Sequence, residues 1–434
     1  MPDAISLLKA MLGPDRIVVA PSGLEAYEIG GSRPAVALFP STPDEAALAL
    51  GEAGKAGLPV VPRGSGSKQH LGAPPPPGFV AICTGRLNSV IDFDPENLTI
   101  TAAAGASLSS IQDTVRHAGL MVPLDPAYSD CATIGGILAS GSNGPGRLMY
   151  GSTRDLTLGL RAALPGGQVI KAGGKTVKNV AGYDVTKLFV GSMGTLGLII
   201  EATMRLRPIP EETRTLIGSC QGLQGIETIV KSVLASSQFA PSALEVISPG
   251  AIAMVRDATE LELAEGYLLV VRLQGLAEEV ESQSSRLAAL GPFQELVEID
   301  RLWRMLRDGL PGGVAARAGL PLTSIWPFLR GIEAAASSVN VECPLIVRAG
   351  VGLAHLFPRA PEEASEALVG FLRRARSLAT ELGGYLVPER GPAHVRSELA
   401  FGDDAGGSFP LAKRIKEVFD PKHIMSPGRF VGGL

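Results

Sequence analysis

The sequence contains little cysteine, few aromatic residues and no long apolar run. Its 434 residues include four cysteines, Cys83, Cys131, Cys220 and Cys343, which lie far apart and form no C-x-x-C pair. Neither a thiolate-ligated iron–sulfur cluster nor a zinc knuckle can be assembled from thiols spaced in this way. Any electron transfer by this chain therefore requires a carrier other than its own cysteines.

The shortage of aromatic and basic side chains argues against nucleic acid as a partner. Aromatic residues make up 5% of the chain, and the formal net charge is -4. Nucleic-acid-binding proteins usually carry a basic surface, or a stripe of basic and aromatic side chains on which bases stack. We therefore expect no nucleic-acid partner.

The sequence also lacks a stretch long enough to form a membrane-spanning helix. Its least polar run, residues 188–200, is interrupted by glycine and is shorter than the roughly 18 to 20 residues that a spanning helix needs. Asp3 and Lys9 lie where a secretory signal peptide has a basic segment followed by an unbroken apolar one. We expect a cytoplasmic chain whose contact with a membrane is only indirect, through partners.

Apolar residues and glycine, by contrast, are abundant. Hydrophobic residues make up 45% of the sequence, which also contains 53 glycines and 33 prolines. This composition predicts a folded protein with many tight turns and more than one domain. Alternating strand-like and amphipathic runs predict an α+β domain at residues 35–212 and a second, α/β domain at residues 213–386. Residues 1–34 form an N-terminal segment, and residues 387–434 form a helix with an extended tail.

The segment VVPRGSGSKQHLG combines glycine with positive charge directly after an apolar run. Glycine tolerates positive φ and has no side chain, so Gly64 and Gly66 allow backbone amides to point at an anion. Arg63 and Lys68 flank these glycines with positive charge. The spacing matches neither the Rossmann fingerprint nor the Walker loop. The segment predicts a phosphate cradle, with a plain hairpin turn as the alternative.

Two further glycine-rich stretches occur in the same predicted domain. Gly135 and Gly136 precede an apolar, helix-like run, and Gly191, Gly194 and Gly197 lead into a run that favours β-structure. Three such loops in one domain predict a long ligand that lies across exposed backbone. A dinucleotide has this shape.

Four ordered stretches carry a family resemblance: PRGSGSKQHLG, TIGGILASGSNGPGRLMYGSTRD, KNVAGYDVTKLFVGSMGTLG and FDPKHIMSPGRF. They resemble the signature stretches of the FAD domain of the vanillyl-alcohol-oxidase type, also called the PCMH type. Within that superfamily the chain is most similar to the FAD-binding subunits of bacterial glycolate oxidases. The resemblance implies an α+β fold, in which an FAD-binding domain of two α+β subdomains is joined by an α/β cap domain and a C-terminal tail returns to the FAD domain.

The resemblance also implies which residues hold FAD. The first loop wraps the pyrophosphate, the second lines the isoalloxazine ring and the ribityl chain, and the third holds the adenosine end. Relatives that tether FAD have a histidine after the glycines of the first loop, whereas this chain has Ser67 and Lys68, so we expect non-covalent FAD. The residues concerned are Arg63, Gly64, Ser65, Gly66, Ser67 and Lys68, then Thr133, Gly135, Gly136, Ser140, Gly141, Ser142 and Asn143, and finally Gly194, Thr195, Gly197 and Ile199.

Two residues near these stretches have alternative interpretations. Cys131 lies close to the position from which some relatives attach flavin through sulfur, but a small, partly buried cysteine is the simpler interpretation. Arg429 in the closing stretch either contacts the cofactor from the tail or forms an ordinary salt bridge.

The predicted cap domain contains altered copies of two motifs of the D-2-hydroxy acid dehydrogenases. These relatives carry H-A-G-D-G-N-x-H and G-E-H-G, which together resemble a metal site with a base. Here the corresponding stretches are RAGVGLAH and PERG, so that Arg348 and Arg390 replace histidines. His355 and Glu389 remain as possible ligands, too few for a defined site, and we expect no catalytic metal.

These replacements allow two hypotheses about catalysis. Oxidation of a 2-hydroxy acid needs a cation for the carboxylate and a base for the hydroxyl proton. In one hypothesis, Arg348 and Arg390 form a bidentate clamp for the carboxylate and His355 is the base. In the other, the motifs have lost their function and the arginines pair with acids such as Glu389.

Together these features predict the FAD-binding subunit of a glycolate (2-hydroxy acid) dehydrogenase or oxidase complex. The resemblance implies that electrons pass from a small 2-hydroxy acid via flavin to an iron–sulfur subunit. The altered cap motifs suggest a second, catalytically complete flavin subunit in the same complex. Two alternatives stay open: an FAD-holding structural or regulatory subunit without catalysis of its own, and a self-sufficient FAD-dependent oxidase of another alcohol.

Overall fold

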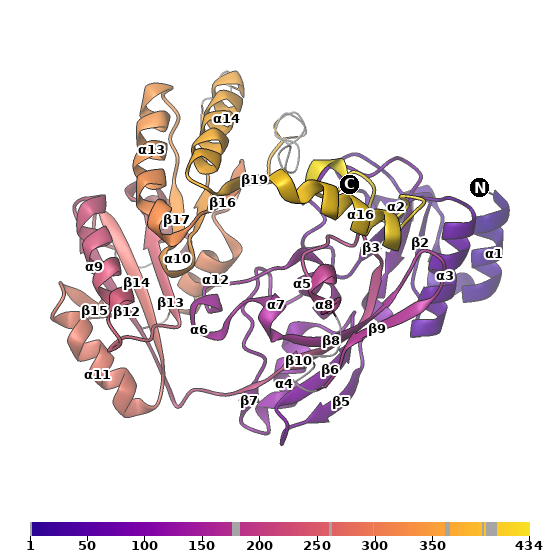
Figure 1. Ribbon diagram of the computed structural model, residues 1–434, viewed down its shortest axis with the longest axis horizontal. Coiled ribbons are helices and arrows are strands. Elements are labelled where there is room, and N and C mark those ends of the chain that lie inside the picture. Colours follow the sequence, from indigo (N-terminus) through magenta and orange to yellow (C-terminus); the bar gives the residue numbers. More distant parts are fainter. Residues whose placement is uncertain are drawn as a thin grey trace. The chain divides into compact units, whose positions relative to one another are not determined.

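The structure is a computed structural model that describes residues 2–175, 183–259, 263–297, 299–360, 365–392, 395 and 406–434. The chain divides into two compact units (Figure 1). Unit 1 comprises residues 1–143, 152–209 and 400–434, and unit 2 comprises residues 144–151 and 210–399. Both units combine helices with sheets, which confirms the predicted α+β class.

The N-terminal part of unit 1 is built on a four-stranded sheet with the strand order β1-β2-β4-β3. β2 and β3 run parallel to β4, and β1 runs antiparallel to β2. The apolar side of α3 is buried against this sheet, and the Thr42 side chain caps the helix by accepting a hydrogen bond from the Glu45 amide. The elements are α1 (Pro2–Leu12), β1 (Ile17–Val18), α2 (Pro21–Leu24), β2 (Val36–Leu38), α3 (Pro43–Lys55), β3 (Val60–Arg63) and β4 (Val80–Cys83).

The second part of unit 1 is a five-stranded antiparallel sheet with the order β5-β6-β10-β8-β9. Helices α4 and α5 bury their apolar side chains against it in one shared core. A short pair, β7 with β11, flanks this sheet. The elements are β5 (Val90–Asp94), β6 (Thr99–Ala103), α4 (Leu108–Arg116), β7 (Leu120–Met121), α5 (Ile134–Ser140), α7 (Thr153–Leu156), β8 (Thr157–Ala163), β9 (Val169–Gly173), α8 (Thr186–Phe189), β10 (Leu198–Arg205) and β11 (Arg207–Pro208).

The C-terminal helix α16 (Phe409–Phe419) and the tail behind it also belong to unit 1. The amide of Val60 in β3 donates a hydrogen bond to the Ile424 carbonyl over 2.8 Å, and the Val60 carbonyl accepts one from the Ser426 amide over 2.8 Å. The tail therefore returns to the strand that leads into the first glycine-rich loop.

Unit 2 is built on an eight-stranded sheet with the order β15-β12-β14-β13-β17-β18-β16-β19, and its neighbouring strands run antiparallel. Apolar side chains of α9, α11, α13 and α14 cover one face, and those of α10 and α12 pack on the other (Figure 1). The elements are α6 (Arg147–Tyr150), β12 (Glu212–Cys220), α9 (Leu223–Ala235), β13 (Ala243–Ile247), α10 (Pro249–Thr259), β14 (Tyr267–Gly275), α11 (Ala277–Ala288), β15 (Phe293–Glu295), α12 (Asp300–Asp308), β16 (Ala315–Gly319), α13 (Ile325–Ser338), β17 (Leu345–Arg348), β18 (Leu353–Leu356), α14 (Ser365–Glu381) and β19 (Tyr385–Arg390).

None of the helices in the described ranges has both the length and the apolar character that membrane crossing requires.

Candidate functional site

The three glycine-rich loops of unit 1 meet in one cavity of about 830 Å³, measured with its open mouth. The first loop follows β3, the second forms the start of α5, and the third precedes β10. The predicted residues that line the cavity are Arg63, Gly64, Ser65, Gly66, Ser67, Lys68, Thr133, Gly135, Gly136, Ser140, Ser142, Gly194, Gly197 and Ile199.

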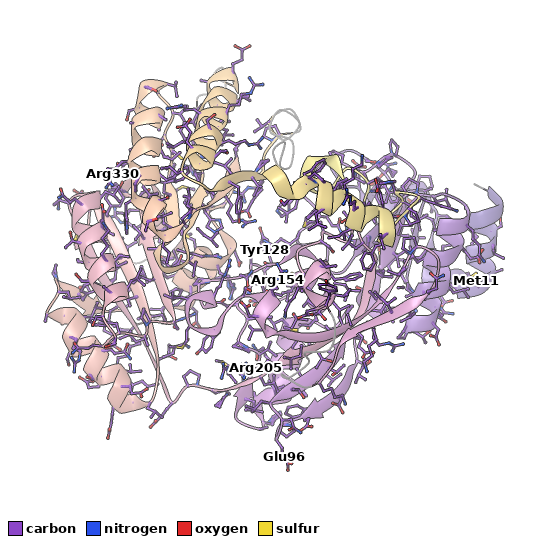
Figure 2. All side chains as sticks on the ribbon, in the orientation of Figure 1. Met11, Glu96, Tyr128, Arg154, Arg205 and Arg330 are labelled. Carbon is purple, nitrogen blue, oxygen red and sulfur yellow. The ribbon has the colours of Figure 1, made fainter. Side chains whose placement is uncertain are left out.

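The cavity is positively charged. Arg63, Lys68 and Arg429 line it, and its described lining contains no aspartate or glutamate. The Arg63 guanidinium lies 5.2 Å from the centre of the Tyr27 ring, and the Lys68 ammonium lies 5.2 Å from the centre of the Tyr128 ring (Figure 2 labels Tyr128). These aromatic faces hold the two cations in place. Three cations in this lining suit an anion such as a diphosphate.

Two glycines of the first loop leave room that any side chain would fill. A Cβ atom built on Gly64 would lie 2.0 Å from Oγ1 of Thr133. Gly66 has a φ of +85°, and a Cβ atom there would lie 2.5 Å from the Arg63 guanidinium. The loop therefore keeps bare backbone beside its cations, and this arrangement fits the diphosphate of FAD.

Helix α5 places the second loop against the cavity. The side chain of Thr133 caps the helix by accepting a hydrogen bond from the Gly136 amide. A Cβ atom on Gly135 would lie 2.8 Å from the Cβ of Ala104, so the helix can approach β6 closely only with glycine there. Ser140 donates its hydroxyl proton to the Gly136 carbonyl over 2.7 Å.

Three predicted FAD-binding residues, Gly141, Asn143 and Thr195, are not among the described lining residues. Gly141 ends α5 in the left-handed conformation, with a φ of 59°. The Asn143 amide nitrogen donates to the Gly141 carbonyl over 2.6 Å, and its oxygen accepts from the Thr153 amide over 2.6 Å. Thr195 donates its hydroxyl proton to the Ser192 carbonyl over 2.6 Å. These residues shape the loops that carry the lining.

Sequence reasoning missed several lining residues, among them Gln69, Thr84 and Ala127. The Gln69 amide nitrogen donates to the Pro62 carbonyl over 2.8 Å, which folds the end of the first loop back onto β3. Its position directly after Lys68 is the one signal that could have marked it. Thr84 begins a short 3-10 helix and Ala127 lies in a turn, and their place at the cavity depends on the fold.

Arg429, which had two interpretations, contacts backbone carbonyls and also lines the cavity. Only 3% of it is exposed. Its guanidinium donates to the carbonyls of Gln69, Leu71 and Ala73 over 2.9, 2.7 and 2.8 Å. Arg429 therefore fastens the tail to the segment behind the first loop.

Lys416, which the sequence analysis did not single out, fastens α16 to the third loop. Its side chain is 2% exposed, and its ammonium donates to Oδ2 of Asp420 over 2.6 Å, to the Thr195 carbonyl over 2.7 Å and to the Met425 carbonyl over 2.9 Å. Burial lowers the pKa of Lys416, and the Asp420 carboxylate opposes this shift. A lysine and an aspartate four residues apart were the available signal, but such a pair usually lies in solvent.

The four cysteines are free thiols. Cys131 is exposed, and its sulfur lies 3.6 Å from the Tyr128 carbonyl. Its neighbours Ala132 and Thr133 line the cavity, whereas Cys131 is not among the described lining residues.

In unit 2, the two altered motifs bring charged side chains to one face of the sheet. Arg348 in β17 lies opposite Glu245 in β13, and His355 in β18 lies opposite Arg317 in β16. Arg348 and Glu245 are buried, and the Arg348 Nε lies 3.9 Å from Oε2 of Glu245. The positive charge of Arg348 is therefore partly compensated by a buried carboxylate.

His355 lies beside Glu389, with its Nδ1 3.6 Å from Oε2 of that residue. The other carboxylate oxygen of Glu389 accepts a hydrogen bond from the Arg317 Nε over 2.8 Å. Burial lowers the pKa of His355 to about 4, and the charges of Arg348 and Arg317 act in the same direction against the opposing effect of Glu389. His355 is therefore neutral at pH 7.

The remaining nitrogen of His355, Nε2, is buried and has no hydrogen-bond partner among the described residues. A buried nitrogen without a partner is uncommon in folded proteins and points to a missing ligand, water or ion. His355 is thus a predicted catalytic residue with a buried ring nitrogen, Nε2, that has no hydrogen-bond partner among the described residues.

Arg390, the second arginine of the predicted clamp, has a different set of partners. Its guanidinium donates to the carbonyls of Gly313 over 3.3 Å and Leu310 over 2.6 Å, and also to that of Gly312. These bonds fasten β19 to the turn before β16. They favour a structural role for Arg390, so that of the two arginines of the predicted clamp Arg348 is the one whose charge acts on His355.

Within the described ranges, no three His, Cys, Asp or Glu side chains converge in a way that could hold a metal ion. His355 and Glu389 are the pair that remains of the metal-binding motifs, and they face each other directly.

Comparison with known sequences assigns both units to families of flavin enzymes. Residues 34–173 match the FAD binding domain family, and residues 209–430 match the family of FAD linked oxidases, C-terminal domain. The chain is 28% identical to the glycolate oxidase subunit GlcD of Bacillus subtilis, with 92% of this chain and 89% of the relative aligned. It is 30% identical to a D-lactate dehydrogenase of Archaeoglobus fulgidus, with 96% and 94% aligned.

Solved structures show the same fold. An alkyldihydroxyacetonephosphate synthase superimposes with a TM-score of 0.74 at 17% identity, covering 98% of this chain and 86% of that chain. A p-cresol methylhydroxylase with bound substrate superimposes with a TM-score of 0.73 at 18% identity, covering 99% and 96%. The predicted PCMH-type fold and the predicted FAD cofactor are thereby confirmed. The chain belongs to the FAD-linked oxidase family and is an FAD-dependent oxidoreductase.

Proposed function

We propose that this oxidoreductase is the FAD-binding subunit of a complex that oxidises small 2-hydroxy acids such as glycolate. The names of the relatives, a glycolate oxidase subunit and a D-lactate dehydrogenase, support this substrate class. The observation that carries the proposal is the cavity of unit 1, in which three glycine-rich loops and three cations surround a space without acids in its described lining. That cavity belongs to a chain aligned with these relatives over nearly its whole length.

The residues of unit 1 bind and orient the cofactor in this proposal. Arg63 and Lys68 hold the diphosphate by charge, and the bare backbone of Gly64 and Gly66 lets amides approach it. Arg429 adds charge and fixes the segment behind the first loop. When bound, FAD supplies an acceptor for the hydride that leaves the α-carbon of the substrate.

The residues of unit 2 bind the substrate and take its proton. Arg348 attracts the carboxylate of the hydroxy acid, because an arginine in a buried site interacts strongly with a carboxylate. His355, which is neutral at pH 7, accepts the hydroxyl proton at Nε2. We propose that FAD is held without a covalent bond, because Ser67 and Lys68 stand where tethering relatives have histidine.

Electrons leave the complex through a partner in this proposal. The four cysteines of this chain are scattered over both units and supply no cluster, so an iron–sulfur subunit takes the electrons onward. The proposal includes a second, catalytically complete flavin subunit, because the cap motifs of this chain are altered at Arg348 and Arg390. Contact with a membrane, if the complex makes any, comes through these partners.

A second candidate function is an FAD-holding subunit without catalysis. Two observations favour it: Glu245 compensates part of the Arg348 charge, and Arg390 is bound to carbonyls of its own unit. In this case the flavin is structural, or relays electrons between other subunits.

Anaerobic visible spectra of the purified holoprotein, alone and in its complex, distinguish the two functions. Glycolate or D-lactate is added, and loss of the oxidised flavin absorbance is followed. Reduction in wild type that an Arg348→Ala variant slows at least tenfold supports the proposed function. An Arg374→Ala variant on the exposed side of α14 is the matched control and should behave as wild type. Flavin that stays oxidised in the complex supports the second candidate, and turnover of another alcohol by the lone chain supports a self-sufficient oxidase.

A further inference from the structure

His355 has two ring nitrogens in different surroundings. Nδ1 faces a carboxylate oxygen of Glu389 at 3.6 Å, whereas Nε2 is buried without a hydrogen-bond partner among the described residues. A neutral imidazole carries its proton on one nitrogen and its lone pair on the other. A carboxylate can only accept a hydrogen bond, so Glu389 places the proton on Nδ1 and leaves the lone pair on Nε2.

Glu389 is itself held in place. Its Oε1 accepts a hydrogen bond from the Nε of Arg317 over 2.8 Å, and the same guanidinium donates from Nη1 to the Tyr385 hydroxyl over 3.3 Å. Arg317 lies opposite His355 in the pairing of β16 with β18. One arginine therefore fixes the carboxylate that faces the histidine.

The charges around His355 come from four strands. Arg348 lies on β17, Glu245 on β13, Arg317 on β16 and Glu389 on β19. The two arginines disfavour a second proton on the ring, while Glu389 stabilises the imidazolium once a proton arrives. The His355 side chain is 14% exposed, whereas its Nε2 atom is buried.

We infer that Glu389 is a positioning residue, anchored by Arg317, that fixes His355 in the tautomer with a free Nε2 lone pair directed at the substrate hydroxyl. This inference rests on the proposed function. The hydroxyl proton would pass to Nε2. FAD, when bound, would supply the two-electron acceptor for the α-hydrogen and its electron pair, so that the hydroxy acid would become the 2-keto acid. The distance of 3.6 Å at Nδ1 shortens when the imidazolium forms, as such contacts tighten in the reacting complex.

The tautomer can be measured without any activity. Histidine labelled with ¹⁵N is incorporated into the holoprotein, and long-range proton–nitrogen spectra are recorded at pH 7. The chain contains five histidines, so the His355 signals are identified by their loss in a His355→Gln variant. Wild type should show a protonated Nδ1 and an unprotonated Nε2. A Glu389→Gln variant should reverse or mix the two forms, because the glutamine amide can donate to Nδ1.

The same variants are then tested for anaerobic flavin reduction by glycolate in the complex. We expect Glu389→Gln to lower the rate constant at saturating substrate at least 100-fold with a KM within threefold of wild type, since the substrate contacts remain. Glu389→Asp should restore part of the rate. The matched control, Glu381→Gln on the exposed side of α14, should change neither rate nor tautomer.

The two readouts separate the inference from the proposed function. A wild-type His355 protonated at Nε2, or a Glu389→Gln variant with unchanged tautomer and rate, overturns the inference. If the tautomer depends on Glu389 as expected but no hydroxy acid reduces the flavin, the proposed function fails and the role of Glu389 in fixing the ring is retained. If the Glu389→Gln protein does not retain FAD, the Arg317→Lys variant is measured in its place. This variant should weaken the hydrogen bond that holds Glu389, so that His355 populates both tautomers.

Discussion

Replacement of Lys416 by methionine tests whether the C-terminal tail contributes to the stability of unit 1 and to FAD binding. The change removes the ammonium from a pair in which Lys416 is 2% and Asp420 is 0% exposed. Asp420 keeps hydrogen bonds from the amides of Ile424 and Met425, but its charge is left without a counter-ion. Loss of one partner from a buried ion pair typically costs about 3 to 5 kcal/mol. Methionine fills most of the space, so little of this loss comes from a cavity.

The same change should weaken FAD binding. Lys416 holds the carbonyl of Thr195 in the third glycine-rich loop, and that loop lines the cavity through Gly194 and Gly197. If about 1.4 kcal/mol of the loss acts on the loop, the dissociation constant of FAD rises about tenfold. Urea unfolding of the apoprotein and fluorescence titration with FAD measure the two effects separately.

Two control variants make this prediction refutable. Lys413→Met, on the exposed side of the same helix, should leave stability and FAD affinity within the error of wild type. The double variant Lys416→Met/Asp420→Asn removes both charges and keeps one oxygen acceptor, for the amide of either Ile424 or Met425. It should therefore be more stable than Lys416→Met alone. A double variant as unstable as the single one would refute the assignment of the loss to an unpaired Asp420 charge.

Three further predictions concern the two sites. Gly64→Ala should reduce FAD content at least tenfold with an unchanged circular dichroism spectrum, because its Cβ would lie 2.0 Å from Oγ1 of Thr133, whereas Gly85→Ala, whose Cβ meets nothing within 4 Å, should retain FAD. Arg429→Met should raise the FAD dissociation constant about tenfold in a fluorescence titration, because three backbone carbonyls lose their donor. Burial lowers the pKa of His355 in the folded chain to about 4, whereas the pKa of a histidine in the unfolded chain is about 6.5. Between these values the unfolded chain binds more protons than the folded chain. The free energy of unfolding should therefore fall by about 2 kcal/mol between pH 7.5 and pH 5. Urea unfolding should show that His355→Gln loses this share of the pH dependence.

The cradle of backbone amides and cations at residues 63–68 could be predicted from the sequence because its chemistry is local. Arg63, Gly64, Gly66 and Lys68 lie within six consecutive residues, and one turn of backbone brings the bare amides and the charges together. Positive φ at Gly66 is a property of the loop itself, and glycine is the residue that adopts it without strain. Composition and spacing are sufficient for a site of this kind.

The contacts that complete the cradle could not be predicted because they join distant parts of the chain. The bond from Lys416 to the Thr195 carbonyl spans 221 residues, and the bonds from Arg429 span 356 to 360. Both side chains donate to backbone carbonyls, which every residue offers and which therefore leave no mark in a sequence. From the sequence alone, a lysine near the end of a chain is expected to lie in solvent, and only the fold shows that Lys416 is buried.

Unit 2 shows why an altered motif does not by itself decide function. The sequence reveals that arginine replaces histidine at position 348, but the effect depends on Glu245, which only the register of β13 with β17 brings alongside. With His355 neutral, the formal charges of Arg317, Arg348, Glu245 and Glu389 sum to zero. In the proposed function, a substrate carboxylate at Arg348 would make this sum negative, and the added negative charge would raise the pKa of His355. The substrate would thus strengthen the base that we propose, whereas the positive charge of a metal ion in the same place would lower the pKa of His355.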